Sequence, residues 1–128
     1  MNSAIINTMF NYKQDEGKLG EEIAVAFLKK NGFKIIDRNF RIRGGEIDII
    51  GIDDDTLVFV EVKTRASNEF GTPLESITYW KLKSLVKTAQ FYKLKHPKLP
   101  DAMRIDAVSI VLDELHNIKD IELVKNIS

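Results

Sequence analysis

The stretch that decides the fold is residues 45–63, which read GEIDIIGIDDDTLVFVEVK. Within it, Glu46–Ile52 and Thr56–Thr64 are rich in Ile, Val and Phe, and a short acidic segment separates them. Two such runs around a polar turn predict a β-hairpin. We interpret Asp53-Asp54-Asp55 as the turn and not as a calcium loop, because no glycine and bidentate glutamate follow at the spacing of an EF-hand.

The carboxylates of this hairpin form an unusual pattern. Side chains alternate along a strand, so a hairpin that turns about Asp54-Asp55 places Asp48 opposite Glu61 and Glu46 opposite Lys63. Facing like charges destabilise a sheet. A divalent cation turns that repulsion into coordination, and Mg²⁺ prefers carboxylate oxygens. The pattern therefore favours a metal site at Asp48 and Glu61; the alternative is a set of solvated charges on an open sheet face. Glu46 and Lys63 are explained by an ordinary ion pair.

The rest of the chain predicts two helices and three further strands. Apolar residues recur at helical spacing before Gly32 and again before His96-Pro97, where a glycine and a proline end each pattern. The resulting order is helix, three strands, long helix, two strands (αβββαββ), which is a mixed central β-sheet of the α/β class flanked by helices. The expected elements are a helix over Gly20–Asn31, a strand over Phe33–Phe40, a loop over Arg41–Gly45, a helix from Pro73 to about Lys95, and strands over Arg104–Leu112 and Lys119–Val124.

The first helix supplies a third candidate carboxylate. Glu21 precedes Ala24 and Leu28 by three and seven residues, so it lies at the edge of the apolar stripe. We expect Glu21 to lean over the sheet toward Asp48 and Glu61, whereas Glu22 points toward solvent. An ordinary surface role for Glu21 stays open.

Composition limits the class of protein. The chain has 128 residues, no cysteine and a formal net charge of zero. We expect one domain over residues 1–128, with a frayed leader over residues 1–12. The absence of cysteine excludes thiolate metal sites and cysteine nucleophiles and fits a cytoplasmic location. No apolar stretch is long enough to span a membrane. Residues 65–100 nevertheless hold 7 basic and 2 acidic residues, so a local phosphate-binding surface is compatible with overall neutrality.

Several motifs identify a resemblance. Asp48 followed by Glu61-Val62-Lys63, with Glu21 upstream, resembles the signature of the PD-(D/E)XK nucleases, the restriction-endonuclease-like superfamily; Ile47 stands where the superfamily pattern has proline. More closely, the chain resembles the bacterial YraN family, also called UPF0102, which is uncharacterised and similar to archaeal Holliday junction resolvases. The matching segments are Gly17-Lys18-Leu19-Gly20-Glu21, Arg38-Asn39-Phe40-Arg41, Gly45-Glu46-Ile47-Asp48, Phe59-Val60-Glu61-Val62-Lys63-Thr64-Arg65, Phe70-Gly71-Thr72-Pro73, Lys81 and Arg104-Ile105-Asp106.

The resemblance implies a restriction-endonuclease-like fold and a metal-dependent nuclease that hydrolyses structured or branched DNA. Asp48, Glu61 and the Val62 carbonyl would hold Mg²⁺ (or Mn²⁺), Lys63 would orient the attacking water, and Glu21 would complete a metal or water contact. The expected contacts to the DNA backbone are Arg41, Arg43, Gly44, Gly45, Arg65 and Lys81, with Lys83 and Lys87 as further candidates. A solvated helix face explains the lysines equally well.

Two other functions remain open at this point. One is a nucleic-acid-binding module that keeps the fold but has little or no turnover. The other is a protein-interaction domain, which fits the zero net charge. The nuclease reading is also compatible with a homodimer, because enzymes that cut branched DNA usually act as dimers to reach two strands.

Overall fold

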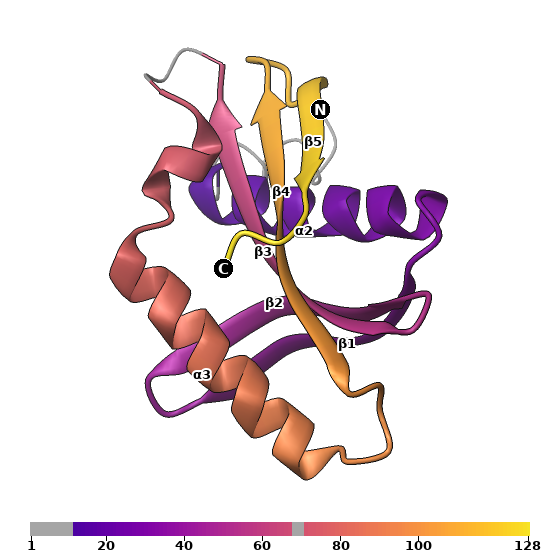
Figure 1. The fold of residues 1–128 in the computed structure, drawn as a ribbon. Coiled ribbons are helices and arrows are strands. Elements are labelled where there is room, and N and C mark those ends of the chain that lie inside the picture. Colours follow the sequence, from indigo (N-terminus) through magenta and orange to yellow (C-terminus); the bar gives the residue numbers. More distant parts are fainter. Residues whose placement is uncertain (1–11, 68–70) are drawn as a thin grey trace.

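The computed structural model describes residues 12–67 and 71–128, so the expected leader over residues 1–12 lies almost wholly outside the described part. The element order is αβββαββ, as the sequence predicts, with one additional short 3₁₀ helix (Figure 1). The elements are α2 (Tyr12–Lys30), β1 (Lys34–Ile42), β2 (Gly45–Asp53), β3 (Thr56–Ala66), η1 (Pro73–Ser76), α3 (Tyr79–Lys95), β4 (Ala102–Leu112) and β5 (Ile118–Val124).

The five strands form one mixed sheet in the order β1-β2-β3-β4-β5. Neighbouring strands are antiparallel except β3 and β4, which pair in parallel. A parallel pair needs a crossover connection, and α3 provides it. The fold is therefore the α/β arrangement with a mixed central sheet that the restriction-endonuclease-like prediction requires.

Within the described residues, helices α2 and α3 cover opposite faces of the sheet (Figure 1). On one face, Leu28 of α2 packs with Val60 of β3 and Val108 of β4. On the other face, Leu85 and Tyr92 of α3 pack with aromatic and aliphatic residues of β2, β3 and β4. This two-sided burial explains why the central strands are almost continuously apolar. None of the helices in the described ranges has the length and apolar composition needed to cross a membrane.

The first helix is longer than the sequence pattern indicates. It begins at Tyr12 and not at Gly20. The added segment contains mostly polar residues and a glycine at position 17. A polar helical segment carries no hydrophobic periodicity, which is why the pattern finds only the part that packs on the sheet.

The predicted loop over Arg41–Gly45 is wrong. Strand β1 continues to Ile42, which pairs with Gly45 at the start of β2, so the turn contains only Arg43 and Gly44. Gly44 has a φ of 84°, a conformation that glycine adopts without steric cost. The two glycines serve a tight turn and a close contact with α3, not a flexible loop.

The predicted long helix from Pro73 is two elements. Pro73–Ser76 form η1, and Ile77 is extended with φ −85° and ψ 96°. Helix α3 then begins at Tyr79, because the Thr78 side chain accepts a hydrogen bond from the Lys81 backbone N–H at 3.1 Å. This break sets the direction in which the first turn of α3 approaches the sheet.

Candidate functional site

The site forms where β2 separates from β3. The backbone pairing of this hairpin has the register predicted from the turn at Asp54-Asp55, and its last pair is Ile49 with Val60. Regular continuation would pair Ile47 with Val62. Instead, the Val62 N–H donates to Asp48 Oδ2 at 2.8 Å. A side-chain carboxylate thus replaces a main-chain acceptor at the point where the strands part.

A local change in strand geometry accompanies this separation. Ile47 belongs to the core on the α3 side and Ile49 to the core on the α2 side. Residues two apart in a regular strand share a face, so the alternation changes at Asp48. The register of β1 places Asn39 opposite Asp48, and Asn39 has a φ of 53°. Asparagine is one of the few residue types that accept this left-handed conformation.

Glu61 faces the α3 side and is almost fully buried, with 5% of its surface exposed. Two lysines approach it. Lys63 Nζ lies 3.8 Å from Glu61 Oε1, and Lys81 Nζ of α3 lies 3.4 Å from Oε2. Oε2 is buried and has no hydrogen-bond partner within the described residues, so the lysines compensate its charge without satisfying its hydrogen-bonding capacity. Lys63 and Glu61 share a face as the sequence predicts.

Asp48 and Glu61 act as a coupled pair. The pKa of Asp48 is raised from 3.8 to about 7: burial is the largest cause, the nearby charge of Glu61 acts in the same direction, and the hydrogen bond from the Val62 N–H opposes the shift. A facing carboxylate pair in a partly dry site holds a proton at neutral pH when no cation is present. This is the electrostatic signature of two carboxylates that a positive charge would stabilise.

Glu21 does not join the pair. Its Oε1 accepts hydrogen bonds from Arg38 at 3.1 Å and from Asn39 Nδ2 at 2.9 Å. The sequence analysis placed Glu21 on the correct side of its helix but missed these two donors on β1. Because Asn39 lies opposite Asp48, Glu21 contacts the strand residue next to the site and not the site itself. Among the side chains that the structure describes, in residues 16–67 and 71–128, no group of three or more His, Asp or Glu is arranged to hold a metal.

Glu46 also has a different ion-pair partner from the one predicted. It pairs with Arg41 across the β1–β2 ladder, with Arg41 Nε 3.1 Å from Glu46 Oε1, and not with Lys63. The reason is the separation of β2 from β3 at Asp48, which removes Glu46 from the strand that carries Lys63. Glu46 remains near enough for its charge to contribute to the raised pKa of Asp48.

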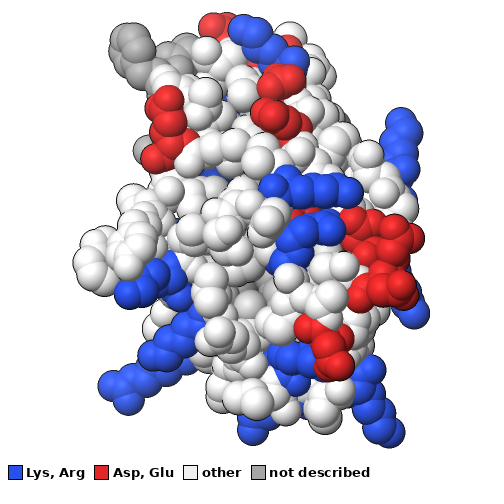
Figure 2. Space-filling view, viewed as in Figure 1, with Lys and Arg blue, Asp and Glu red and all other residues white. Residues whose placement is uncertain are grey.

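The predicted DNA contacts fall in three places. Arg41, Arg43, Gly44 and Gly45 lie at the tip of the β1–β2 hairpin, under α3 (Figure 1). Arg65 lies half-buried near the end of β3. Lys81, which we predicted as a backbone contact, lies in the site beside Glu61. Figure 2 shows Lys and Arg side chains gathered along the lower left edge, where α3 lies in Figure 1.

The places of two residues in this arrangement were not predicted: Lys81, which we expected only as a DNA contact, lies beside Glu61, and Asn39 lies opposite Asp48. The position of Lys81 depends on where α3 starts, and Thr78 three residues earlier is the capping signal that could have located it. The position of Asn39 depends on its backbone conformation. An asparagine inside an apolar strand is a weak signal for such a residue.

Taken together, these features define an α/β domain of restriction-endonuclease-like architecture in which the half-buried Asp48 and the buried Glu61 lie at a break in the sheet and two lysines approach Glu61. Comparison with known proteins then gives the family. The model of the uncharacterised protein family UPF0102 matches residues 20–110. The chain belongs to this family.

The sequences of curated relatives match this chain over nearly their whole length. A UPF0102 protein of Persephonella marina is 46% identical over 105 residues, which cover 82% of this chain and 90% of the relative. A UPF0102 protein of Caldicellulosiruptor saccharolyticus is 43% identical over 114 residues, covering 89% and 97%. One of Clostridium kluyveri is 37% identical over 118 residues, covering 92% and 97%.

Proposed function

We propose that this protein is a metal-dependent nuclease that hydrolyses phosphodiester bonds in structured or branched DNA. The observation that carries the proposal is the facing pair of Asp48 and Glu61. The pair lies where β2 separates from β3, Asp48 accepts the Val62 N–H there, and two lysines approach Glu61. A sequence selected for folding alone gains nothing from a half-buried carboxylate opposed to a buried one.

The donor set fits a hard divalent cation such as Mg²⁺ or Mn²⁺. Asp48 and Glu61 supply carboxylate oxygens, and Glu61 Oε2 is a buried acceptor with unused capacity. The Val62 N–H faces the β2 side of the sheet, and the N–H and C=O of one strand residue point to the same side. The Val62 carbonyl is therefore the third expected ligand. When bound, the cation would lower the pKa of a water molecule and neutralise charge on the phosphate.

The residues of the chain perform the remaining tasks. Lys63 and Lys81 place two ammonium groups beside Glu61, where they favour the approach of a phosphodiester and stabilise charge that develops on it. Lys63 also orients the attacking water. Arg38 and Asn39 hold Glu21 against β1, and Asn39 lies opposite Asp48 in the β1–β2 ladder. Arg41 and Arg43 at the hairpin tip contact the DNA backbone.

A second candidate function is a nucleic-acid-binding module with little turnover. The observation that favours it is that Glu21 is already held by Arg38 and Asn39, so two carboxylates and not three face the break. Both functions would use the same surface for DNA. They differ in whether the carboxylates are needed for a covalent change in the substrate.

Cleavage assays separate the two functions. Linear, flapped and four-way DNA would each be incubated with the protein in EDTA, Mg²⁺ or Mn²⁺. We expect cleavage only with the metal, strongest on a branched or flapped substrate, and lost in Glu61→Gln. Glu122→Gln, an exposed carboxylate of β5, is the matched control and should keep full activity. Binding without cleavage in every condition would favour the binding module.

A further inference from the structure

Helix α3 presents two exposed aromatic rings at its start. Tyr79 and Trp80 are 64% and 74% exposed and belong to neither core. Their ring centroids lie 5.3 Å apart at an angle of 71°, and Lys83 Nζ lies 5.1 Å from the Tyr79 centroid and 5.7 Å from the Trp80 centroid. Rings of this size would gain free energy if they were removed from water. Single exposed apolar residues are common on protein surfaces, but an adjacent pair of rings with a cation close to both is not explained in that way.

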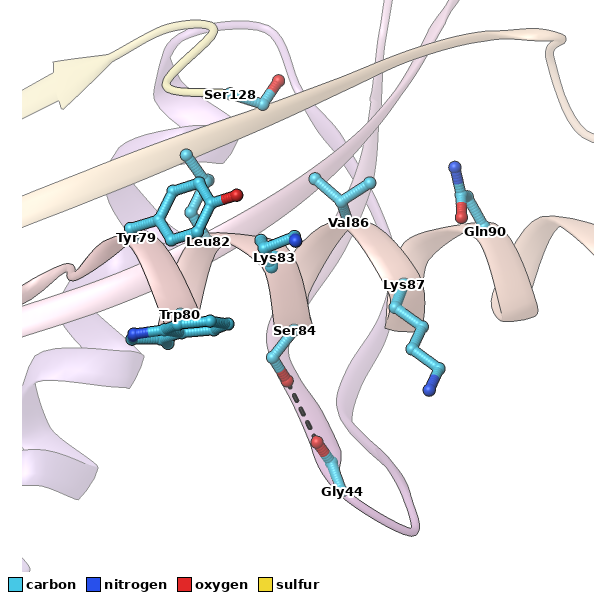
Figure 3. A pocket seen from close by; sticks show the side chains of 10 residues that line it. All are labelled: Gly44, Tyr79, Trp80, Leu82, Lys83, Ser84, Val86, Lys87, Gln90 and Ser128. Atoms are coloured by element: carbon cyan, nitrogen blue, oxygen red, sulfur yellow. Dashed lines mark hydrogen bonds between the residues drawn. The ribbon is translucent and has the colours of Figure 1, made fainter.

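These residues line a cavity of about 660 Å³ on the outer side of α3. Figure 3 shows the rings projecting from the first turn, with Lys83, Ser84 and Lys87 following along the helix. The Ser84 hydroxyl donates to the Gly44 carbonyl at 3.0 Å, and through Gly44 the tip of the β1–β2 hairpin also lines the cavity. The described lining residues include two lysines and no acidic side chain. The surface therefore combines aromatic faces with positive charge.

The cavity and the candidate site lie on different sides of the first turn of α3. Lys81 follows Trp80 directly in sequence and reaches inward to Glu61 at 3.4 Å, whereas Trp80 faces solvent. A helix with its side chains is about 10–12 Å across. A nucleic-acid chain that rests on the outer face of α3 can therefore continue past the end of the helix to the carboxylate pair.

We propose that Tyr79, Trp80, Lys83 and Lys87, which we call the α3 platform, bind unpaired nucleotides of a single-stranded DNA segment. Bases stack on the two rings, and the lysines contact the flanking phosphates; stacking of this kind accepts any base, because every base has a π-face. The surface favours single-stranded DNA because the phosphates are negative, like the partner that the lysines require, and the bases are planar, like the partner that the aromatic rings require. The proposal rests on the proposed nuclease function and specifies its substrate as DNA with an unpaired segment next to the cleaved bond.

Trp80 makes the test direct, because it is the only tryptophan in the chain. Its fluorescence would be measured in EDTA during titration with a twelve-nucleotide oligo(dT), an abasic strand of equal length and a blunt duplex. We expect saturable quenching by oligo(dT), with roughly ten-fold weaker binding of the abasic strand and the duplex. Equal affinity for oligo(dT) and the abasic strand, or no binding of oligo(dT), would overturn the proposal.

Matched variants locate the binding. Lys83→Gln should weaken oligo(dT) binding several-fold. Lys95→Gln should leave it unchanged, although Lys95 is on the same helix and lies 5.5 Å from the Phe91 ring. With labelled oligo(dT) and anisotropy, Trp80→Ala should lower affinity roughly ten-fold, whereas Leu94→Ala, which removes another highly exposed apolar side chain of α3, should not. Equal effects within either pair would contradict the assignment.

The outcomes distinguish this proposal from the nuclease itself. Oligo(dT) binding through Trp80, with no cleavage under any metal condition, would support the α3 platform and reject the nuclease. Glu61-dependent cleavage of plain duplex, unaffected by Trp80→Ala, would support the nuclease and reject the platform.

Discussion

Among single residues, Asp48 matters most for the proposed metal site. Its carboxylate accepts the Val62 N–H and faces Glu61, and burial together with that neighbour raises the pKa of Asp48 to about 7. In the unfolded chain the same group titrates near pH 3.9. Between about pH 3.9 and about pH 7, Asp48 therefore carries a proton in the folded, metal-free protein more often than it does in the unfolded chain.

This difference predicts that Asp48 destabilises the metal-free protein as the pH rises. A carboxyl group with a raised pKa in the folded state contributes stability that is complete below pH 4 and is lost as the pH passes through about 7. Asp48→Asn cannot titrate and keeps an acceptor for the Val62 N–H. In EDTA, its free energy of unfolding relative to the parent should rise by on the order of 2 kcal/mol between pH 5 and pH 8.

Urea denaturation at both pH values measures this difference. Asp120→Asn, an exposed carboxyl of β5, is the matched control and should follow the parent at both values. A parent and an Asp48→Asn variant that respond identically to pH would show that Asp48 is an ordinary solvated carboxylate.

The facing of Asp48 and Glu61 was predictable because the turn at Asp54-Asp55 fixes the register of the hairpin. The hydrogen bond from Val62 was not, since it depends on β2 leaving β3. The donors to Glu21 were not predictable either. They come from β1, and their position follows from the left-handed backbone at Asn39, which a sequence pattern does not reveal.

At the element scale, the tip of the β1–β2 hairpin is held under α3. A Cβ atom added at Gly45 would collide with the Thr88 hydroxyl, and Thr88 is buried on α3. The missing side chain at Gly45 thus permits the close approach of the hairpin tip to α3. The sequence pattern located both glycines of the tip but assigned them to a loop, because the contact with α3 is long-range.

Gly45→Ala should therefore destabilise the fold by about 1–3 kcal/mol, because either the hairpin tip or the Thr88 side chain must move. Gly17→Ala is the opposite control: Gly17 lies in α2 with open space around it, and alanine is the better helix former. We expect it to stabilise the fold by about 0.5–1 kcal/mol. Urea denaturation of the two variants should thus shift in opposite directions. A neutral Gly45→Ala would mean that the tip is not tightly packed.

In the part of the chain that the structure describes, the element order was predictable because α2, α3 and the strands place buried or partly buried apolar residues at their characteristic spacing. The helix boundaries that were predicted wrongly lie where packing leaves no periodic pattern of apolar residues in the sequence. Residues 12–19 of α2 are mainly polar, and the break before α3 depends on Ile77 and the Thr78 cap and not on hydrophobicity.

At the scale of the whole molecule, a net charge of zero coexists with a basic edge along α3 (Figure 2). We expect nucleic-acid binding that is weak and strongly dependent on salt, because only a few phosphates are neutralised. If Arg41, Arg43, Lys83 and Lys87 each neutralise one phosphate, affinity for a single strand should fall roughly 50-fold between 50 mM and 200 mM salt. Titration of labelled DNA at several salt concentrations measures the slope. Nanomolar binding that ignores salt would contradict this charge distribution.

Thermal unfolding with and without Mg²⁺ tests whether Asp48 and Glu61 bind a divalent cation. The parent and Asp48→Asn would be compared in EDTA and in increasing Mg²⁺ at pH 8. A cation that binds only the folded site stabilises it by about 2.7 kcal/mol at one hundred times the dissociation constant. We predict that Asp48→Asn melts at or above the parent temperature in EDTA, that the parent gains stability with Mg²⁺, and that the variant gains little. Equal Mg²⁺ responses in the two proteins would show that the carboxylate pair is not a metal site.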